Sequence, residues 1–459
     1  MKKFLSFHRG LKSRHVSFIA LGGIIGSSFF LGTGYVLNQV GPFAFIAYAL
    51  GGLITFLTMA CLAELSVAVP IHGSFVRYAS KFISPSWGCG VGWSYWINWV
   101  VYIPSECIAA GILMHSFVPE LPVYLWSVIF GILITVINLS DVKAFGEMEF
   151  WLSLTKMIIL FGFSLLAILI FFGLIGSQKP EIIGTKYLIT HKGIFPNGFA
   201  VLFINMVVLI ANFQGSEIIG LSAAESEDPK KNIPRALKKV TYRLILLYFI
   251  PIFLLGLIFP WEKANLSGSV FAVALHSYGL IHIAHVFSFL IIAGAISCAN
   301  SGLYAATRSL HTLSLMGMAP PFLKKVDKNG VPIVTSLITL GVVWMMLIIS
   351  FFLSAHKLYA NLLALSGFTG SISWISICWS QLRYRKKLKA KMQNDMSLEF
   401  KIKGFPYITL FAIWIQIICL LIVLFNPDLR SSFYFGVPAL VVPILIYKYL
   451  TLKNKKIIT

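Results

Sequence analysis

Four ionisable side chains lie inside or at the ends of long apolar runs, where charge is least expected. They are Glu64, Glu106, Lys156 and Glu217. A charged group near the centre of a bilayer costs about 3 kcal/mol or more unless it is paired or hydrated. Such groups mark ion or substrate pathways, so each of the four is a candidate functional residue.

Each candidate also admits a structural explanation. Glu64 lies shortly before Pro70, at the end of its apolar run, and could sit in the wet interface of the membrane. Lys156 could extend its long side chain to the membrane surface, but wholly apolar sequence follows it, which favours a buried partner. Glu106 follows Pro104 in an aromatic-rich stretch, and there we favour a binding role. Glu217 is the strongest candidate because of its surroundings.

Two of the apolar runs are interrupted near their centres. The first contains GGIIGSS at 22–28, and the sixth contains NFQGSE at 212–217. Glycine lowers helix stability by about 1 kcal/mol, and serine competes for backbone hydrogen bonds. Interruptions five spans apart predict an inverted-repeat transporter with discontinuous helices. Close helix packing is the alternative use of glycine in membranes, but it does not explain Gln214, Ser216 and Glu217 beside the second interruption.

An unwound helix exposes backbone groups that suit a zwitterion. The free amides at the start of a half-helix, with the positive end of its dipole, favour a carboxylate. The free carbonyls at the end of the other half favour an ammonium group. An α-amino acid carries both groups on one carbon, so paired broken helices predict a receptor for the part that all amino acids share.

The elements that must position these residues are membrane-spanning helices. The chain has 459 residues, 58% hydrophobic and 12% charged, with mean hydropathy +0.85, whereas a soluble domain has about 25% charged residues. Lipid offers no partner to a free backbone group, so long apolar runs cross it as helices. We expect an all-α membrane protein with about twelve spans. These lie near 16–37, 42–69, 88–117, 122–140, 150–175, 198–222, 241–260, 284–311, 331–353, 358–381, 405–425 and 432–451.

The distribution of charge predicts orientation and excludes several functions. Most of the 37 Lys and Arg residues fall in alternate loops with the two ends of the chain, which by the positive-inside rule makes both termini cytoplasmic. The basic runs lack interleaved aromatic residues, so the net charge of +21 does not indicate nucleic-acid binding. No Gly-Lys dipeptide occurs, which excludes the usual ATP-binding loop. Neither the six cysteines nor the histidines show metal-ligand spacing, and no enzyme, metal or cofactor is predicted.

Four stretches carry a resemblance to a known family. They are LKSRHVSFIALGGIIGSSFFLGTG at 11–34, AELSVAVPIHGSFVRYA at 63–79, FQGSEIIGLSAAESEDPKKNIPRALKKV at 213–240 and ANSGLYAATRSLHTLSLMGMAPP at 299–321. The chain resembles the amino acid permease branch of the amino acid–polyamine–organocation superfamily, nearest to the bacterial lysine-specific permeases. The resemblance implies two inverted repeats of five helices and two further helices. The expected organisation is an N-terminal segment 1–15, repeats 16–175 and 198–381, a basic cytoplasmic loop 382–403, helices eleven and twelve in 404–451, and a tail 452–459.

The resemblance also implies roles for residues at the two breaks. The substrate carboxylate would bind at Gly26, Ser27 and Ser28. Its ammonium group would meet carbonyls near Ile24, Phe213 and Gln214, with Gly215 in the same broken segment. The family usually has glycine where Ser28 stands, and Ser28 adds bulk and a hydroxyl that bear on substrate size and affinity. A second departure is Ala224, where the family again usually has glycine.

The ionisable candidates acquire roles by the same resemblance. Glu217 matches an acidic residue of the broken sixth helix, a candidate for substrate binding or proton coupling. Glu106 lies on the third helix, where the family places residues of the substrate cavity. Lys156 matches a lysine that replaces a sodium ion in proton-coupled relatives. Glu225 is a candidate for the inner gate, or a solvated charge that pairs with Arg235.

These observations predict proton-coupled uptake of lysine or arginine through the cell membrane, because the expected cavity holds two carboxylates and one cation. A permease for neutral or aromatic amino acids, an amino acid exchanger and a sensor that does not transport are the alternatives. The expected partners are the amino acid, a proton and the lipid bilayer. The sequence leaves the oligomeric state open.

Overall fold

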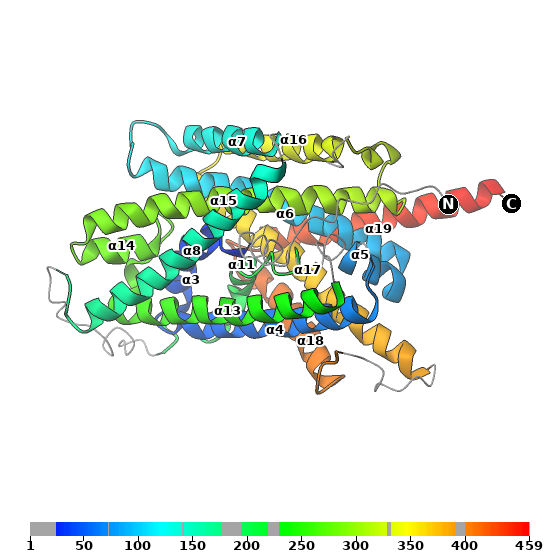
Figure 1. The fold of residues 1–459 in the computed structure, drawn as a ribbon, viewed down its shortest axis with the longest axis horizontal. Coiled ribbons are helices and arrows are strands. Elements are labelled where there is room, and N and C mark those ends of the chain that lie inside the picture. The colour runs from blue at the N-terminus through cyan, green and yellow to red at the C-terminus, as the bar shows by residue number, and fades with distance from the viewer. Residues whose placement is uncertain are drawn as a thin grey trace.

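The computed structural model describes residues 24–71, 73–139, 142–176, 194–218, 229–327, 332–390 and 400–458. Within these ranges the chain is helical and contains no β-strand. The helices lie side by side in one elongated bundle (Figure 1). The predicted all-α fold is confirmed.

Each of the twelve predicted spans corresponds to helix in the structure. In chain order these are α2 (Ser27–Phe30) with α3 (Gly32–Val40), α4 (Ala44–Ala68), α6 (Pro85–His115), α7 (Val123–Leu139), α8 (Val142–Phe171), α10 (Ala200–Ile204) with α11 (Met206–Ala211), α13 (Pro229–Ile258), α15 (Ile281–Leu315), α16 (Ile333–Ile349), α17 (Ala355–Ala390), α18 (Tyr407–Ile422) and α19 (Ser431–Ile458). Short helices connect them, among them α5 (Ser74–Tyr78), the π-helix η1 (Ala79–Ile83), the 3₁₀-helix η3 (Trp261–Lys263) and α14 (Val270–Ser277). Among the described residues, seven helices are long and apolar enough to cross a membrane, and three shorter helices are also apolar.

Some helices extend into segments that were expected to be loops. The first part of the predicted basic loop 382–403 is helical as far as Ala390, because α17 continues through it. The predicted tail 452–459 belongs to α19 as far as Ile458. Lysine, arginine, leucine and alanine are all strong helix formers, so charge alone does not end a helix. At 36 residues, α17 is about 54 Å long, and its charged end extends beyond a hydrocarbon core about 30 Å thick.

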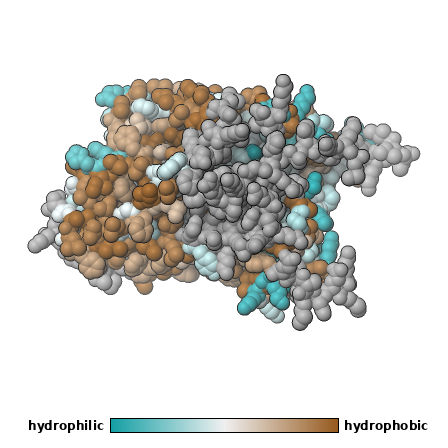
Figure 2. All heavy atoms as spheres, in the orientation of Figure 1, coloured by the Kyte–Doolittle hydropathy of each residue, from teal (hydrophilic) through white to brown (hydrophobic). Residues whose placement is uncertain are grey.

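The interior of the bundle is built around α6 and α17. Helix α6 packs against α15, α17 and α7, and α13 packs along α4. The apolar windows of α6 and α17 are 89% and 83% buried, whereas that of α19 is 11% buried. Hydrophobic side chains cover much of the outer face (Figure 2), as expected of a surface in contact with lipid. Polar residues in the apolar windows of α6 and α17 therefore lie mostly in the interior of the bundle.

Candidate substrate site

Both predicted interruptions are present. In the first span, Gly26 is extended, with φ −114° and ψ −167°, and α2 begins after it. In the sixth span, α11 ends at Ala211, and the chain runs through turns as far as Glu217. Gly215 there has φ +101°, a left-handed conformation that favours glycine. The first and sixth spans are thus discontinuous, as the sequence predicted.

Tyr248 on α13 holds the two breaks together. Its hydroxyl lies 2.8 Å from the carbonyl oxygen of Asn212 in the sixth span, to which it donates a hydrogen bond. The same hydroxyl lies 3.4 Å from the carbonyl of Ile24 in the first span. The ring of Phe29 stacks on the Tyr248 ring with centroids 4.1 Å apart. The carbonyls of Ile24 and Asn212 therefore lie close to one hydroxyl. Asn212 was not among the carbonyls expected to meet an ammonium group, and Tyr248 was not predicted from the sequence.

The Glu106 carboxylate occupies the first break. Its Oε2 accepts a hydrogen bond from the backbone N–H of Ser27 at 2.8 Å. A Cβ atom on Gly26 would lie 2.4 Å from Glu106 Oε1 and 2.7 Å from the Tyr102 hydroxyl, so only glycine leaves room for these groups. The Ser28 hydroxyl is 2.8 Å from the Tyr102 hydroxyl. Gly26, Ser27, Ser28 and Glu106 are therefore brought together, and the Ser27 amide binds a carboxylate of the protein itself.

Several polar atoms near this break have no hydrogen-bond partner among the described residues. They are Oε1 of Glu106 and the hydroxyl groups of Ser27 and Tyr359, all of them buried. Tyr359 lies on α17, and its hydroxyl is 3.9 Å from the Cβ position of Gly32, just beyond the break. Buried polar groups are nearly always paired. These three groups are therefore candidates for contact with a proton, water or ligand.

Glu217 is, in contrast, fully engaged at the second break. Its carboxylate accepts hydrogen bonds from the Tyr95 hydroxyl on α6 and from Trp374 Nε1 on α17, each at 3.1 Å. The Gly215 N–H also donates to it at 3.1 Å. All these groups are donors to a carboxylate, which is an acceptor. Glu217 therefore closes the sixth-span break and joins it to α6 and α17.

Gln214 fastens the same break to α17. Its Nε2 donates to the carbonyls of Ser366 and Gly367, each at 3.3 Å. A Cβ atom at Gly370 would lie 1.9 Å from this nitrogen, so glycine at this position permits the close approach. Phe213, also predicted at the site, is fully buried, and its carbonyl accepts a 2.6 Å hydrogen bond from the Ser216 hydroxyl. The Gln214 side chain thus has a positioning role within the protein.

Lys156 is buried on α8 and does not extend to the membrane surface. Its methylene groups lie 3.5 Å from the Cβ position of Gly294 on α15. The small residue on α15 thus makes space for the lysine side chain between the two helices. The expectation of burial is confirmed for this residue.

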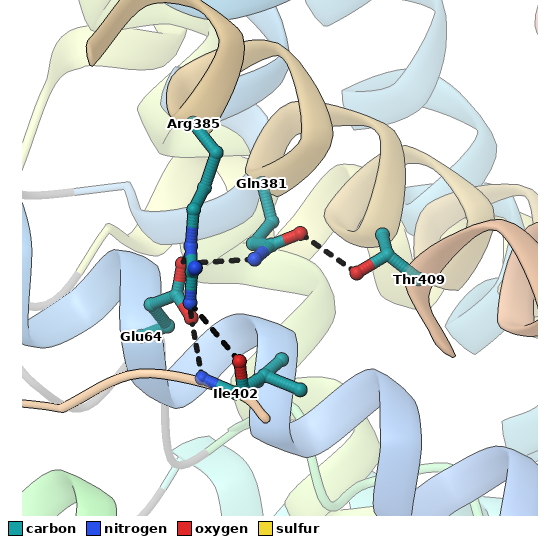
Figure 3. Close-up of polar contacts among 5 residues, drawn as sticks. All are labelled: Glu64, Gln381, Arg385, Ile402 and Thr409. Carbon is teal, nitrogen blue, oxygen red and sulfur yellow. Dashed lines mark hydrogen bonds and ion pairs between the residues drawn. The ribbon is translucent and has the colours of Figure 1, made fainter. Parts of the chain in front are cut away.

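Glu64 is buried and paired within the protein, so the interpretation that left it in contact with water is wrong. Arg385 on α17 donates to it from Nε at 2.7 Å and from Nη2 at 2.6 Å. Gln381 Nε2 and the Ile402 N–H each donate at 2.8 Å (Figure 3). Thr409 in turn donates to Gln381. Sequence reasoning missed Arg385 because it placed that residue in a loop.

The aromatic residues of α6 that lie beside the two carboxylates follow a pattern that the sequence does contain. Tyr95, Trp99, Tyr102 and Glu106 are spaced by four, three and four residues. This spacing places them on one face of α6. Reading the aromatic stretch by its helical face would have found Tyr95 and Tyr102.

The described candidate residues are closed off from solvent. Ser27, Lys156 and Glu217 are each 0% exposed, and Glu106 is 1% exposed. The described ranges contain no group of three or more His, Cys, Asp or Glu residues able to hold a metal ion. Glu225, Ala224 and the glycines at 22 and 23 lie outside the described residues. Access to the breaks therefore requires a rearrangement of the helices.

Comparison with known proteins places this geometry in a family. The amino acid permease family matches residues 15–457. The chain is 38% identical to the amino-acid permease RocE of Bacillus subtilis, over 98% of this chain and 96% of that protein. It is 34% identical to the lysine-specific permease LysP of Escherichia coli, over 91% and 86% of the two chains. A γ-aminobutyric acid permease of Bacillus subtilis is 32% identical over 97% and 94%, so the names of the relatives specify more than one substrate.

The fold also matches a solved structure from a different group of transporters. The manganese transporter of Eremococcus coleocola, crystallised with an aromatic bis-isothiourea compound, aligns with a TM-score of 0.58 and 14% sequence identity. The alignment covers 96% of this chain and 94% of that one. At this identity the likeness concerns the fold alone.

Proposed function

The chain belongs to the amino acid permease family, and from that premise we propose that it takes up a basic amino acid, lysine or arginine, together with a proton by alternating access. Membership makes it a multi-pass membrane transporter of an amino acid and not an enzyme. The basic substrate, the proton and the cytoplasmic placement of both termini are our proposals. The lysine-specific name of two relatives at 34% identity supports the basic substrate.

The observation that carries the coupling proposal is the position of Glu106. Its Oε2 binds the Ser27 amide, and its Oε1 has no partner among the described residues. The Ser27 amide is the group proposed to receive the substrate carboxylate. Two carboxylates cannot share that amide favourably, because both carry negative charge in a site of low dielectric constant.

Protonation of Glu106 resolves this competition. A proton on Oε1 removes the buried negative charge, which is costly where that oxygen has no donor among the described residues. The neutral acid binds the Ser27 amide more weakly, and the amide becomes available to the substrate. Binding of one proton then favours binding of one amino acid, which is the requirement for symport.

The remaining candidates have complementary roles in this proposal. The carbonyls of Ile24, Phe213 and Gln214 receive the α-ammonium group. Glu217 preserves the second break and supplies negative charge toward a cationic side chain. Lys156 holds α8 against α15 and is the second candidate for proton coupling, with Glu217 the third.

Uptake into proteoliposomes tests the proposal. Purified protein is reconstituted, and accumulation of radiolabelled lysine and arginine is measured with and without an inward proton gradient. We expect the gradient to drive accumulation of at least one of these substrates. Equal uptake with and without the gradient would refute proton coupling, and competition by all twenty amino acids tests the basic substrate independently.

A permease for neutral or aromatic amino acids is the second candidate. The rings of Phe29, Phe213 and Tyr248 meet beside the breaks, and an apolar side chain would pack against them. Competition by aromatic or small neutral amino acids, with none by lysine, would favour it. Efflux that depends on external substrate would identify an exchanger, and binding without uptake would identify a sensor.

A further inference from the structure

Exposed cations gather where α17 ends. One lies on η1, four lie on α17 and two lie just before α18. They are Lys81, Arg383, Lys386, Lys387, Lys389, Lys401 and Lys403. Residues 79–83, 383–390 and 400–407 contain no Asp or Glu. Hydrophilic residues gather at the lower edge of the view in Figure 2, near the start of α18. We call these seven residues the basic surface.

The hydrogen bonds of Glu64 with Arg385 and Ile402 hold two segments of the basic surface together. Arg385 points inward from α17 to Glu64, while the Ile402 N–H binds the same carboxylate from the segment before α18 (Figure 3). Arg385 also donates to the Ile402 carbonyl at 3.3 Å. The internal ion pair therefore fixes Lys401 and Lys403, on either side of Ile402, beside the end of α17.

Two aromatic rings lie beneath the cations. Lys81 Nζ and Lys387 Nζ lie 5.6 and 5.8 Å from the centroid of Phe82. Arg385 Cζ and Lys389 Nζ lie 4.8 and 5.8 Å from the centroid of Phe405. Each ring attracts cations and keeps two of them close together. Neighbouring cations repel one another, so an anion between them would be stabilised.

The basic surface begins where the apolar part of α17 ends. The part of α17 from 355 to 382 has no Asp, Glu or Arg and one lysine, at its start, and its apolar window is largely buried in the bundle. The cations begin at Arg383, where the helix leaves the apolar layer. Over the complete stretch 383–403, which includes residues outside the described ranges, eight Lys and Arg stand against Asp395 and Glu399. The excess of positive charge therefore persists when those residues are counted.

We propose that the basic surface binds the phosphate headgroup of an anionic phospholipid. The lysines donate to the phosphate oxygens, and the rings of Phe82 and Phe405 keep the cations close together. A lysine close to an anionic membrane surface strengthens binding about fivefold. The Glu64–Arg385 pair is the positioning element, because its hydrogen bonds hold the end of α17 beside the segment before α18. This proposal concerns lipid and does not depend on the identity of the transported amino acid.

Lipid binding by the full-length protein tests the proposal. Purified protein in neutral detergent is titrated with phosphatidylglycerol or phosphatidylcholine, and bound lipid is measured by native mass spectrometry. We expect a preference for phosphatidylglycerol. Replacing Lys386, Lys387 and Lys389 with Gln should weaken its binding by about a hundredfold, at about fivefold for each lysine, while phosphatidylcholine binding stays the same.

A control variant distinguishes binding at the basic surface from attraction to the overall positive charge of the protein. Lys448 and Lys453 are exposed on α19, outside the basic surface, and their replacement with Gln should leave phosphatidylglycerol binding unchanged. Inorganic phosphate at the same concentration should not displace the lipid, because it lacks the acyl chains. Equal loss in both variants, or full displacement by inorganic phosphate, would overturn the proposal. All substituted lysines are exposed, so size-exclusion elution should match that of the unmodified protein.

Discussion

Replacing Glu106 with Gln separates substrate binding from proton coupling. The substitution keeps the side-chain size, so the space opposite Gly26 stays filled, but it removes the group that takes up a proton. The Ser27 N–H to Glu106 bond is 2.8 Å long. A hydrogen bond to a charged acceptor contributes about 1.5–3 kcal/mol and one to a neutral acceptor about 0.5–1.5 kcal/mol. The neutral side chain therefore holds the amide more weakly by about 1 kcal/mol, or about fivefold in affinity.

The expected result is a change in the pH dependence of binding. In the unmodified protein, the substrate concentration at half-maximal uptake should rise as pH rises, because ionised Glu106 competes for the Ser27 amide. In the Gln variant this concentration should be independent of pH and, at high pH, lower by about fivefold. Accumulation driven by a proton gradient should be lost, while exchange of labelled for unlabelled substrate across the membrane continues. Proteoliposome uptake and exchange assays measure both quantities.

A surface carboxylate supplies the control. Glu262 on η3 is exposed, and its replacement with Gln should leave uptake, exchange and pH dependence unchanged. Gradient-driven accumulation by the Glu106 variant, with the original pH dependence, would refute the competition between carboxylates. A folded Glu106 variant that is inactive in both uptake and exchange would also contradict the proposal, because the proposal expects the Gln variant to retain exchange.

Three further substitutions test the packing around the breaks and the internal ion pair by thermal unfolding in detergent. Gly26→Ala places a methyl group 2.4 Å from Glu106 Oε1 and should abolish uptake and destabilise the protein by about 1–3 kcal/mol; normal uptake would contradict the close packing. Glu217→Gln turns an amide N–H₂ toward Trp374 and other donors, and should lower the free energy of unfolding by about 1–3 kcal/mol. Unchanged stability would contradict the hydrogen bonds described for the Glu217 carboxylate. Arg385→Leu leaves Glu64 charged and buried, and should cost about 3–5 kcal/mol, most of it regained when Glu64→Leu is added. A double variant no more stable than the single one would contradict that explanation.

The spans and their interruptions could be predicted from the sequence because both are local properties. An apolar run of about 20 residues must cross lipid as a helix, whatever surrounds it. The polar segment 212–217 weakens the helix through its own residues. The burial of Lys156 followed in the same way from the apolar sequence after it. Helix ends were less predictable, because basic residues continue a helix as readily as they form a loop, as in α17.

The partners of the ionisable residues were decided only by the tertiary structure. Glu106 and Ser27 are 79 residues apart, Tyr95 and Glu217 are 122 apart, and Glu64 and Arg385 are 321 apart. No local pattern specifies which distant donor meets a given carboxylate, because that depends on how whole helices pack. The sequence alone thus determined that carboxylates lie within a membrane transporter. The packing of α4, α6 and α17 decided that Glu217 and Glu64 have several donors while one oxygen of Glu106 has none among the described residues, and an unpaired oxygen is where a proton can bind.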